Sequence, residues 1–204
     1  MRSTIAPEQP GTSEVLAILN TEVQVNMNDR VTTYYLEITN PADVRSASSH
    51  TTPVQVQRAE IPCPALSRFL YTNVGRAWRW TDKLPWTDEQ WLAYLDRPVL
   101  QTWLGFVAGT PAGYFELESQ DAGNVEIVTF GLLPQFVGNG FGGQLLSAAI
   151  TQAWAFGATR IWLHTCSLDG PAALPNYQAR GFRVYREETS EEARGSSNTD
   201  QQQR

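Results

Sequence analysis

The sequence predicts an α+β fold in which helices flank a mixed, mainly antiparallel central sheet. Three apolar segments, "TWLGFVAG" (102–109), "AGYFELES" (112–119) and "VEIVTFGLL" (125–133), follow one another across short, turn-rich connections. Such spacing is typical of an antiparallel meander. A helical pattern, a strand, a second helix and a last strand then alternate, which predicts a crossover back onto the same sheet.

The first half of the chain supplies two strands and two helices. Segments 31–39 and 54–61 are rich in β-branched and aromatic residues near a period of two, which favours strands. Segment 64–75 has apolar residues at helical spacing and ends at Gly75. Segment 87–98 begins with Thr87 three residues before Gln90, a capping-box pattern, so we expect a second helix there. Residues 40–53 have the composition of a surface loop.

The second half contains the strongest helical pattern. Segment 140–157 carries one apolar stripe and ends at Gly157. The residues of the stripe are Leu145, Leu146, Ala149, Ile150, Ala153 and Trp154. Segments 159–166 and 182–188 are predicted strands, and 170–181 is a short predicted helix with Pro171 near its start.

Length and composition predict a single globular domain over residues 14–188. The 204-residue chain is 42% hydrophobic, whereas segments 1–13 and 189–204 have too few apolar side chains for a core, so we expect both to be disordered. The net charge of −6 argues against a nucleic-acid partner and suits a cationic substrate better. The two cysteines and two histidines form no metal-ligand spacing, so no metal site is expected. Neither a signal peptide nor a membrane span is apparent, which predicts a cytoplasmic protein without a membrane partner.

A glycine-rich stretch stands between the third meander strand and the long helix. Its residues are Gln135, Phe136, Val137, Gly138, Asn139 and Gly140. A helix N-terminus exposes unpaired amides, and glycines let phosphate oxygens approach them, so this stretch predicts a pyrophosphate site. The Walker pattern needs Lys followed by Ser or Thr, which is absent here. Gly138, Gly140 and Gly143 match dinucleotide spacing, but the preceding strands are predicted to be antiparallel. A glycine-rich turn without a ligand is the remaining alternative.

Several motifs together resemble the GNAT superfamily of N-acetyltransferases. Residues 135–140 fit the family's Q/R-x-x-G-x-G/A signature, and "LLP" (132–134) is similar to its strand end. Tyr177 to Phe182 is similar to its Y-x-x-x-G-F segment, and Ala112-Gly113 resembles the entry to its third strand. The resemblance covers roughly residues 100–188 in the family's order, so this part is the expected acyl-CoA-binding core of a GNAT-like fold.

The resemblance implies a function and a set of cofactor-binding residues. Members transfer an acetyl group from acetyl-CoA, as co-substrate, to an amine of a small molecule or peptide by direct attack in a ternary complex. Residues 135–140 would bind the pyrophosphate. Phe130, Gly131 and Leu132 would contact the pantetheine in a gap between splayed strands. A homodimer is common in the family. The alternative is a binding module of the same fold that senses acyl-CoA without turnover.

The resemblance also implies catalytic residues. Tyr177 stands where members place the acid that protonates the leaving thiolate, and we expect it at the start of its helix. Glu126 is the candidate base, because the strand "VEIVTFGLL" is similar to that of histone-acetylating members. The residues alone leave Glu116, Glu118, His164 and water as alternative bases. Members often have an asparagine at the place of Gly170; the preceding Asp169 is expected to cap the helix.

The segment "RAWRWTDKLPW" (76–86) combines three tryptophans with charged residues. Core packing would explain such tryptophans, but a loop of this composition also predicts a lid or wall over the acceptor. An aromatic wall there could hold an ammonium group by cation–π contact. The sequence does not identify the acceptor amine.

Overall fold

The computed structural model describes residues 28–47 and 52–193 of the chain. The predicted disordered N-terminus, 1–13, lies outside the described residues. Residues Val31–Ser190 form one compact unit, and the site described below lies within it. The other unit, Met1–Arg30 with Glu191–Arg204, contributes to the description only the first residues of β1 and the last three of β7.

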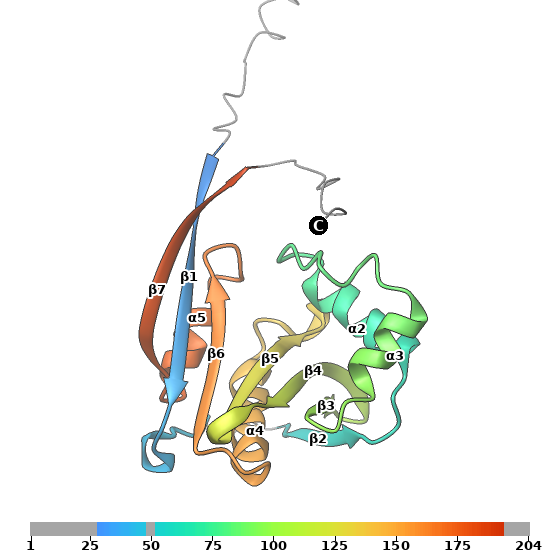
Figure 1. Cartoon of the computed structure of the whole chain (residues 1–204). Coiled ribbons are helices and arrows are strands. Elements are labelled where there is room, and N and C mark those ends of the chain that lie inside the picture. Colours follow the sequence, from blue (N-terminus) through green and yellow to red (C-terminus); the bar gives the residue numbers. More distant parts are fainter. Residues whose placement is uncertain (1–27, 48–51, 194–204) are drawn as a thin grey trace, which may run out of the picture. The chain divides into compact units, whose positions relative to one another are not determined.

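A seven-stranded sheet organises the compact unit (Figure 1). The strands are β1 (Asn28–Ile38), β2 (Val54–Ala59), β3 (Leu100–Val107), β4 (Thr110–Ser119), β5 (Asn124–Leu132), β6 (Arg160–Cys166) and β7 (Arg183–Ala193). Their order is β2-β3-β4-β5-β6-β1-β7. The run from β2 to β5 is antiparallel and β6 is parallel to β5, so the predicted meander followed by a crossover is confirmed. The first strand in the chain, β1, pairs antiparallel with β6 near the opposite end of the sheet.

In the described residues, four α-helices accompany the sheet. They are α2 (Pro64–Gly75), α3 (Asp88–Leu95), α4 (Phe141–Ala155) and α5 (Ala173–Ala179), with 3₁₀ turns η1 (Pro41–Asp43), η2 (Asp121–Gly123) and η3 (Pro134–Phe136). The capping box of α3 is confirmed, because the Gln90 amide donates to Thr87 Oγ1 and the Thr87 amide donates to Gln90 Oε1.

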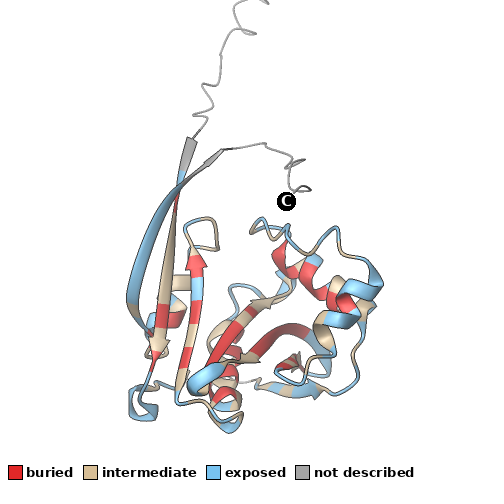
Figure 2. Ribbon diagram, in the orientation of Figure 1, coloured by how far each residue is buried: buried red, intermediate tan, exposed pale blue. Residues whose placement is uncertain are grey.

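Alternation along the strands gives the sheet two different faces. Leu145, Leu146 and Ile150 of α4 pack against one face, on apolar side chains such as Phe115 and Ile127. Helix α2 packs against the opposite face through a smaller apolar cluster. Successive strand residues point to opposite sides, so Glu116 and Glu126 lie on the face that α2 covers. Figure 2 shows that the central strands and these two helices hold most of the buried residues, whereas β7 is largely exposed.

Strand β7 runs further than the sequence predicts. The sequence places the start of a disordered tail at 189, yet the strand continues to Ala193. Polar contacts with β1 explain the extension: the Tyr35 hydroxyl donates to Glu188, and the hydroxyls of Thr32 and Thr189 lie 3.2 Å apart. Pairing with β1 therefore orders the polar end of β7, although this segment has few apolar side chains to bury. The rest of the predicted tail lies outside the described residues.

Strands β5 and β6 pair over only a short stretch. The parallel register joins Asn124–Glu126 to Arg160–Trp162 and stops there. On its other side β5 remains paired with β4, but the register skips Val128, since Glu116 is opposite Thr129 and Leu117 is opposite Ile127. This bulge bends β5 at the point where it leaves β6. The sheet therefore opens next to Glu126.

Candidate active site

The edge of β5 that faces β6 is unpaired beyond Glu126 in the described part of the chain. The three residues predicted to contact pantetheine, Phe130, Gly131 and Leu132, lie on this stretch, and all are half-buried. Their other backbone edge pairs with β4. A Cβ on Gly131 would come 2.3 Å from Val74 Cγ1 of α2, so glycine is what lets the helix pack here. An extended ligand arm could pair with this free edge as an extra strand would.

The glycine-rich stretch lies between β5 and α4, at the N-terminus of that helix. Gly138 and Gly140 have φ values of 82° and 79°, a left-handed conformation that other residues adopt only with strain. Gly140 is the N-cap of α4 and, as a glycine, has no side chain to cap the first turn. Residues 138–140 are exposed, and Asn139 donates back to the carbonyls of Gln135 and Val137. The left-handed glycines and the lack of a side chain at Gly140 let an anion approach the start of the helix, where the macrodipole is positive.

Asn176 of α5 and Arg180, the C-cap of that helix, also approach the first turn of α4. The sequence did not indicate either of them as a site residue. Asn176 Nδ2 donates to the Gly142 carbonyl oxygen at 3.3 Å. Arg180 Nη1 would lie 2.7 Å from a Cβ placed on Gly143, and Arg180 Nε is buried without a hydrogen-bond partner among the described residues. A guanidinium beside a helix N-terminus adds positive charge for a phosphate. The only sequence signal for Arg180 was its place inside the Y-x-x-x-G-F segment.

Tyr177 enters the same region from α5. Its ring packs edge-on against Phe130, with 6.0 Å between ring centroids, and the side chain is buried. Burial raises the pKa of the Tyr177 phenol, so the hydroxyl keeps its proton. The helix begins at Ala173, which places Tyr177 in the middle of α5 rather than at its start.

Asp169 does not cap α5, contrary to the expectation. Its carboxylate accepts hydrogen bonds from Thr165 Oγ1 at 2.6 Å and from the Cys166 amide at 3.0 Å. The N-cap of α5 is Ala172 instead. The carboxylate thus closes the turn that follows β6, because two donors at the end of that strand are nearer than the helix amides.

Four side chains form a hydrogen-bonded chain where β5 and β6 part, and they include Glu126. The Trp162 indole N–H donates to Gln120 Oε1 at 3.0 Å, and Gln120 Nε2 donates to Glu126 Oε2 at 2.8 Å. The other carboxylate oxygen, Oε1, lies 3.3 Å from His164 Nδ1. The structure therefore brings together two of the candidate bases, Glu126 and His164. Gln120 was not among the predicted site residues.

This chain has a defined direction. An indole N–H can only donate, so Gln120 must present its oxygen to Trp162 and its NH₂ group to Glu126. The carboxylate then accepts from Nδ1–H of His164, which leaves Nε2 as the imidazole's free lone pair. The hydrogen bond to Glu126 raises the pKa of His164, against a smaller opposing effect of burial. The His164 side chain is 51% exposed, so a substrate amine could reach it.

Glu116 and Glu118, the other predicted carboxylates, already have partners. Glu116 is almost fully buried; its Oε2 accepts from the Tyr94 and Thr129 hydroxyls and lies 3.5 Å from Lys83 Nζ. Glu118 pairs with Arg97 at 2.7 Å. Of the three predicted carboxylates, Glu126 is therefore the one connected to a histidine, while the other two hold cationic side chains of the chain itself.

The tryptophan-rich segment 76–86 connects α2 and α3 on this side of the sheet. Trp78 reaches the loop between β6 and α5, because a Cβ on Gly170 would lie 2.9 Å from the Trp78 ring. Trp80 packs on Gly75, and Trp86 packs on Trp91 of α3. The segment thus extends from the helices to the far side of the β5–β6 opening, as a wall over that opening would.

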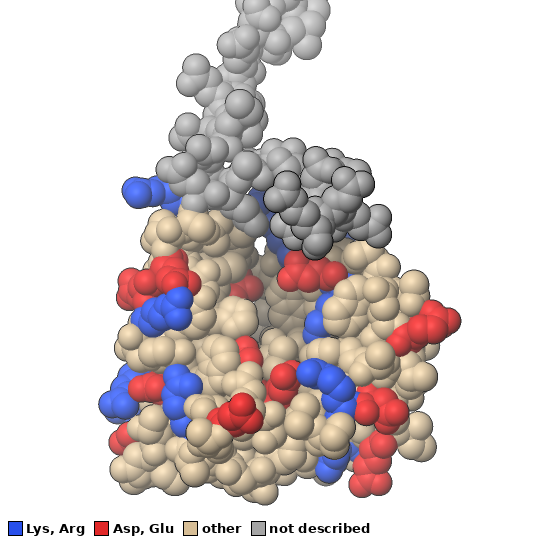
Figure 3. Space-filling model, in the orientation of Figure 1, with Lys and Arg blue, Asp and Glu red and all other residues tan. Residues whose placement is uncertain are grey.

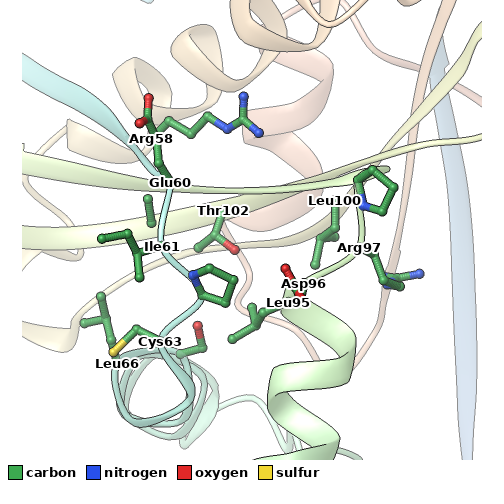
Figure 4. A pocket seen from close by; sticks show the side chains of 14 residues that line it. Arg58, Glu60, Ile61, Cys63, Leu66, Leu95, Asp96, Arg97, Leu100 and Thr102 are labelled. Carbon is green, nitrogen blue, oxygen red and sulfur yellow. The ribbon is translucent and has the colours of Figure 1, made fainter.

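Figure 3 shows both acidic and basic side chains at the edge of a hollow that lies between β6 and α2. A separate pocket of about 260 Å³ lies where β2, α2, α3 and β3 meet (Figure 4). Arg58, Glu60, Cys63 and Asp96 are among the residues that line it. None of the predicted cofactor-binding or catalytic residues lines this pocket, so we place the candidate active site at the β5–β6 opening.

Comparison with known proteins identifies the family. The family model described as "Acetyltransferase (GNAT) family" matches residues 65–182. The chain belongs to the GNAT acetyltransferase family. The matched region includes α2, α3, the splayed strands, the glycine-rich stretch and Tyr177. No curated protein sequence gave a significant match.

Solved structures of GNAT proteins share the fold. A GCN5-related N-acetyltransferase from Kribbella flavida has 19% identity and a TM-score of 0.60, covering 92% of this chain and 65% of its own. A GCN5-related N-acetyltransferase from Sphaerobacter thermophilus has 17% identity and a TM-score of 0.57, covering 88% of this chain and 56% of its own. The chain thus spans less than two thirds of each protein.

A third similar structure is an aminoglycoside acetyltransferase from an uncultured soil metagenomic sample, in complex with sisomicin. It has 11% identity and a TM-score of 0.52, with 62% of this chain and 87% of its own covered. At these identities the three structures support the GNAT-like fold alone.

In the described residues, no helix is long and apolar enough to cross a membrane.

Proposed function

We propose that this protein is an N-acetyltransferase that moves an acetyl group from acetyl-CoA to an amine by direct attack. The observation that carries the proposal is the Glu126–His164 pair, fixed beside the point where β5 and β6 separate. A pair of this kind is what an amine nucleophile requires, since an ammonium ion must lose a proton before it can attack a thioester.

The residues present fit acetyl-CoA as the co-substrate. The N-terminus of α4 at Gly140, with the positive end of its macrodipole, would hold the pyrophosphate, with Arg180 nearby. Phe130, Gly131 and Leu132 would hold the pantetheine along the free edge of β5. Bound acetyl-CoA supplies a thioester, an activated acyl group. From Gly140, strand β5 leads back to the bulge at Val128, beside the face of the sheet that carries both Glu126 and Glu116.

His164 Nε2 is the atom that we assign to receive the amine's proton. Glu126 holds the imidazole by Nδ1 and stabilises the imidazolium that forms. Because Glu126 raises the pKa of His164, the imidazole is neutral, and able to accept a proton, only above a pH higher than usual for histidine. The base predicted from the sequence, Glu126, thus acts in this proposal through the histidine that was one of its alternatives.

Tyr177 is the proposed acid. Its ring packs on Phe130, one of the residues proposed to hold the pantetheine, and burial raises its pKa so that it is protonated at neutral pH. A phenol in that state can donate to the thiolate that leaves when the carbon–sulfur bond breaks.

The acceptor that suits the site is a cationic amine. The face beside His164 carries Glu126, and the net charge of the chain is −6. Aromatic rings of Tyr35 and Trp162 flank His164, with centroid distances of 6.0 and 6.3 Å. Carboxylates and aromatic faces both attract ammonium groups. The similar aminoglycoside acetyltransferase, bound to sisomicin, is consistent with an acceptor of this charge.

A thiol-release assay with acetyl-CoA and a panel of amines tests the proposal. We expect release of free CoA to depend on the amine and to be faster for polyamines and aminoglycosides than for neutral or acidic amines. Calorimetry with acetyl-CoA in the same buffer separates the alternatives. Tight binding of acetyl-CoA without turnover on any amine would support the non-catalytic binding module and contradict the proposal.

A further inference from the structure

Lys83 is the only lysine in the 204-residue sequence, in which all other basic residues apart from the histidines are arginines. It lies in the segment between α2 and α3, and only 14% of its side chain is exposed. Lysine and arginine are not equivalent in such a place, since a buried ammonium can lose its proton whereas a guanidinium keeps its charge. Lys83 is therefore the one internal amine that could act as a nucleophile.

Four aromatic side chains surround the Lys83 ammonium, and we call them the aromatic box. Lys83 Nζ lies 3.9 Å from the ring centroid of Tyr94, 5.6 Å from Trp86, 5.7 Å from Tyr71 and 6.0 Å from Trp91. These distances lie within cation–π range. The rings also pack on one another, with centroids of Trp86 and Trp91 5.2 Å apart. The box is thus a preformed ammonium site with the chain's own lysine in it. Of the three tryptophans in segment 76–86, it includes Trp86.

A buried carboxylate completes this site. Lys83 Nζ lies 3.5 Å from Glu116 Oε2, which already accepts from the hydroxyls of Tyr94 and Thr129. The second oxygen, Glu116 Oε1, is buried and has no hydrogen-bond partner among the described residues. Its lone pairs are therefore available to take a proton. Desolvation by burial lowers the pKa of Lys83 despite the attraction of Glu116, which favours loss of that proton.

The position of Glu116 connects the box to the proposed acyl site. Glu116 is opposite Thr129 at the β5 bulge, and Thr129 directly precedes Phe130, the first of the proposed pantetheine contacts. The ammonium is thus two contacts away from β5, through Glu116 and Thr129. It lies on the α2 side of the sheet, the side on which Glu126 also lies.

We propose that Lys83 is a self-acetylation site, modified by acetyl-CoA bound to the same chain. This inference rests on the proposed function. In the step, Glu116 accepts a proton from the Lys83 ammonium, and the neutral amine attacks the thioester carbonyl. A carbon–nitrogen bond forms, the carbon–sulfur bond breaks, and the nitrogen gives up its second proton, which the CoA thiolate takes up. The products are Nε-acetyl-Lys83 and free CoA, with no oxidant or reductant required.

Intact-protein mass spectrometry tests this directly, because the chain has a single lysine. The full chain is incubated with acetyl-CoA without any acceptor, and the modified residue is located by peptide sequencing after proteolysis. We expect one acetyl group per chain at Lys83. Its rate constant should stay the same when the protein is diluted about tenfold, since the reacting groups belong to one molecule.

Lys83→Arg is the matched control, because it keeps a cation in the box and removes the nucleophile. This variant should bind acetyl-CoA as the wild type does and gain no acetyl group at position 83. Wild-type protein that binds acetyl-CoA and acetylates an added amine, but leaves Lys83 unmodified, would overturn the inference and leave the proposed function intact. Modification that persists in urea-unfolded protein at the native rate would also overturn it, since that result identifies uncatalysed acetylation. Absence of acetyl-CoA binding would overturn both proposals.

Discussion

Replacement of Glu126 by Gln should remove most of the catalytic activity, and the hydrogen-bonded chain around it explains why. The side chain keeps its size, so the network can persist. Trp162 fixes the oxygen of Gln120, and Gln120 therefore still donates its NH₂ group toward position 126. The new amide must accept that bond with its oxygen and turn its own NH₂ group toward His164 Nδ1.

The substitution thus reverses the histidine's tautomer. With an amide donor at Nδ1, the neutral imidazole carries its proton on Nε2, which then cannot accept a proton from the amine. Loss of a general base costs about 10²- to 10⁴-fold in rate. Even the lower limit corresponds to about 2.7 kcal/mol of transition-state stabilisation. We therefore expect kcat to fall by about 10²-fold or more, with little change in acetyl-CoA affinity.

The pH profile supplies an independent readout. Glu126 raises the pKa of His164, so the wild-type acid limb of kcat/KM should lie above the usual histidine range. Loss of the carboxylate removes the interaction that favours the imidazolium. The pKa of His164 should fall, and the acid limb of the residual activity should move to lower pH.

Steady-state kinetics from pH 5 to 9, with Glu118→Gln as a matched control, would test this reasoning. Glu118 is the cross-strand neighbour of Glu126 but pairs with Arg97, so its replacement removes a charge from the same face without touching the network. The control should retain most of its activity. A Glu126→Gln variant with wild-type kcat and an unshifted acid limb would refute the assignment. Equal losses in both variants would indicate a general electrostatic effect instead.

Three further substitutions test other parts of the site. Tyr177→Phe should lower kcat while acetyl-CoA affinity measured by calorimetry changes little, because only the transferable proton is lost; weaker binding with an intact kcat would make Tyr177 a packing residue. Gly140→Val should weaken acetyl-CoA binding by about 2 kcal/mol or more, the scale of a charge-assisted contact, and unchanged affinity in a variant shown to be folded by circular dichroism would contradict the phosphate site. Gly170→Ala would place a methyl group 2.9 Å from the Trp78 ring. We therefore expect the indole to move and KM for the amine to rise. An unchanged KM would show that Trp78 does not contact the substrate amine.

Local patterns predicted most of the elements and the proposed cofactor-binding stretch. The helix at 64–75, the capping box at Thr87 and the apolar stripe of α4 depend on neighbouring residues in the chain, which is why periodicity and spacing could predict them. The glycine-rich stretch between β5 and α4 is equally local, since positive φ at Gly138 and Gly140 and the start of the helix follow from residues adjacent in sequence. The sequence named Glu126 as the candidate base, but left Glu116, Glu118, His164 and water as alternatives.

Contacts between distant segments selected among those bases. Glu126 differs from Glu116 and Glu118 because Gln120 and Trp162 direct it toward His164, whereas the other two carboxylates face Lys83 and Arg97. The aromatic box likewise unites α2, α3 and the segment between them around one ammonium. The position of β1 between β6 and β7, and the extension of β7 beyond 188, also depend on strand pairing between the two ends of the described chain. A sequence pattern records which face of an element is apolar, but the partner of a polar side chain depends on which elements the packed core brings together, and the tertiary structure alone decides that.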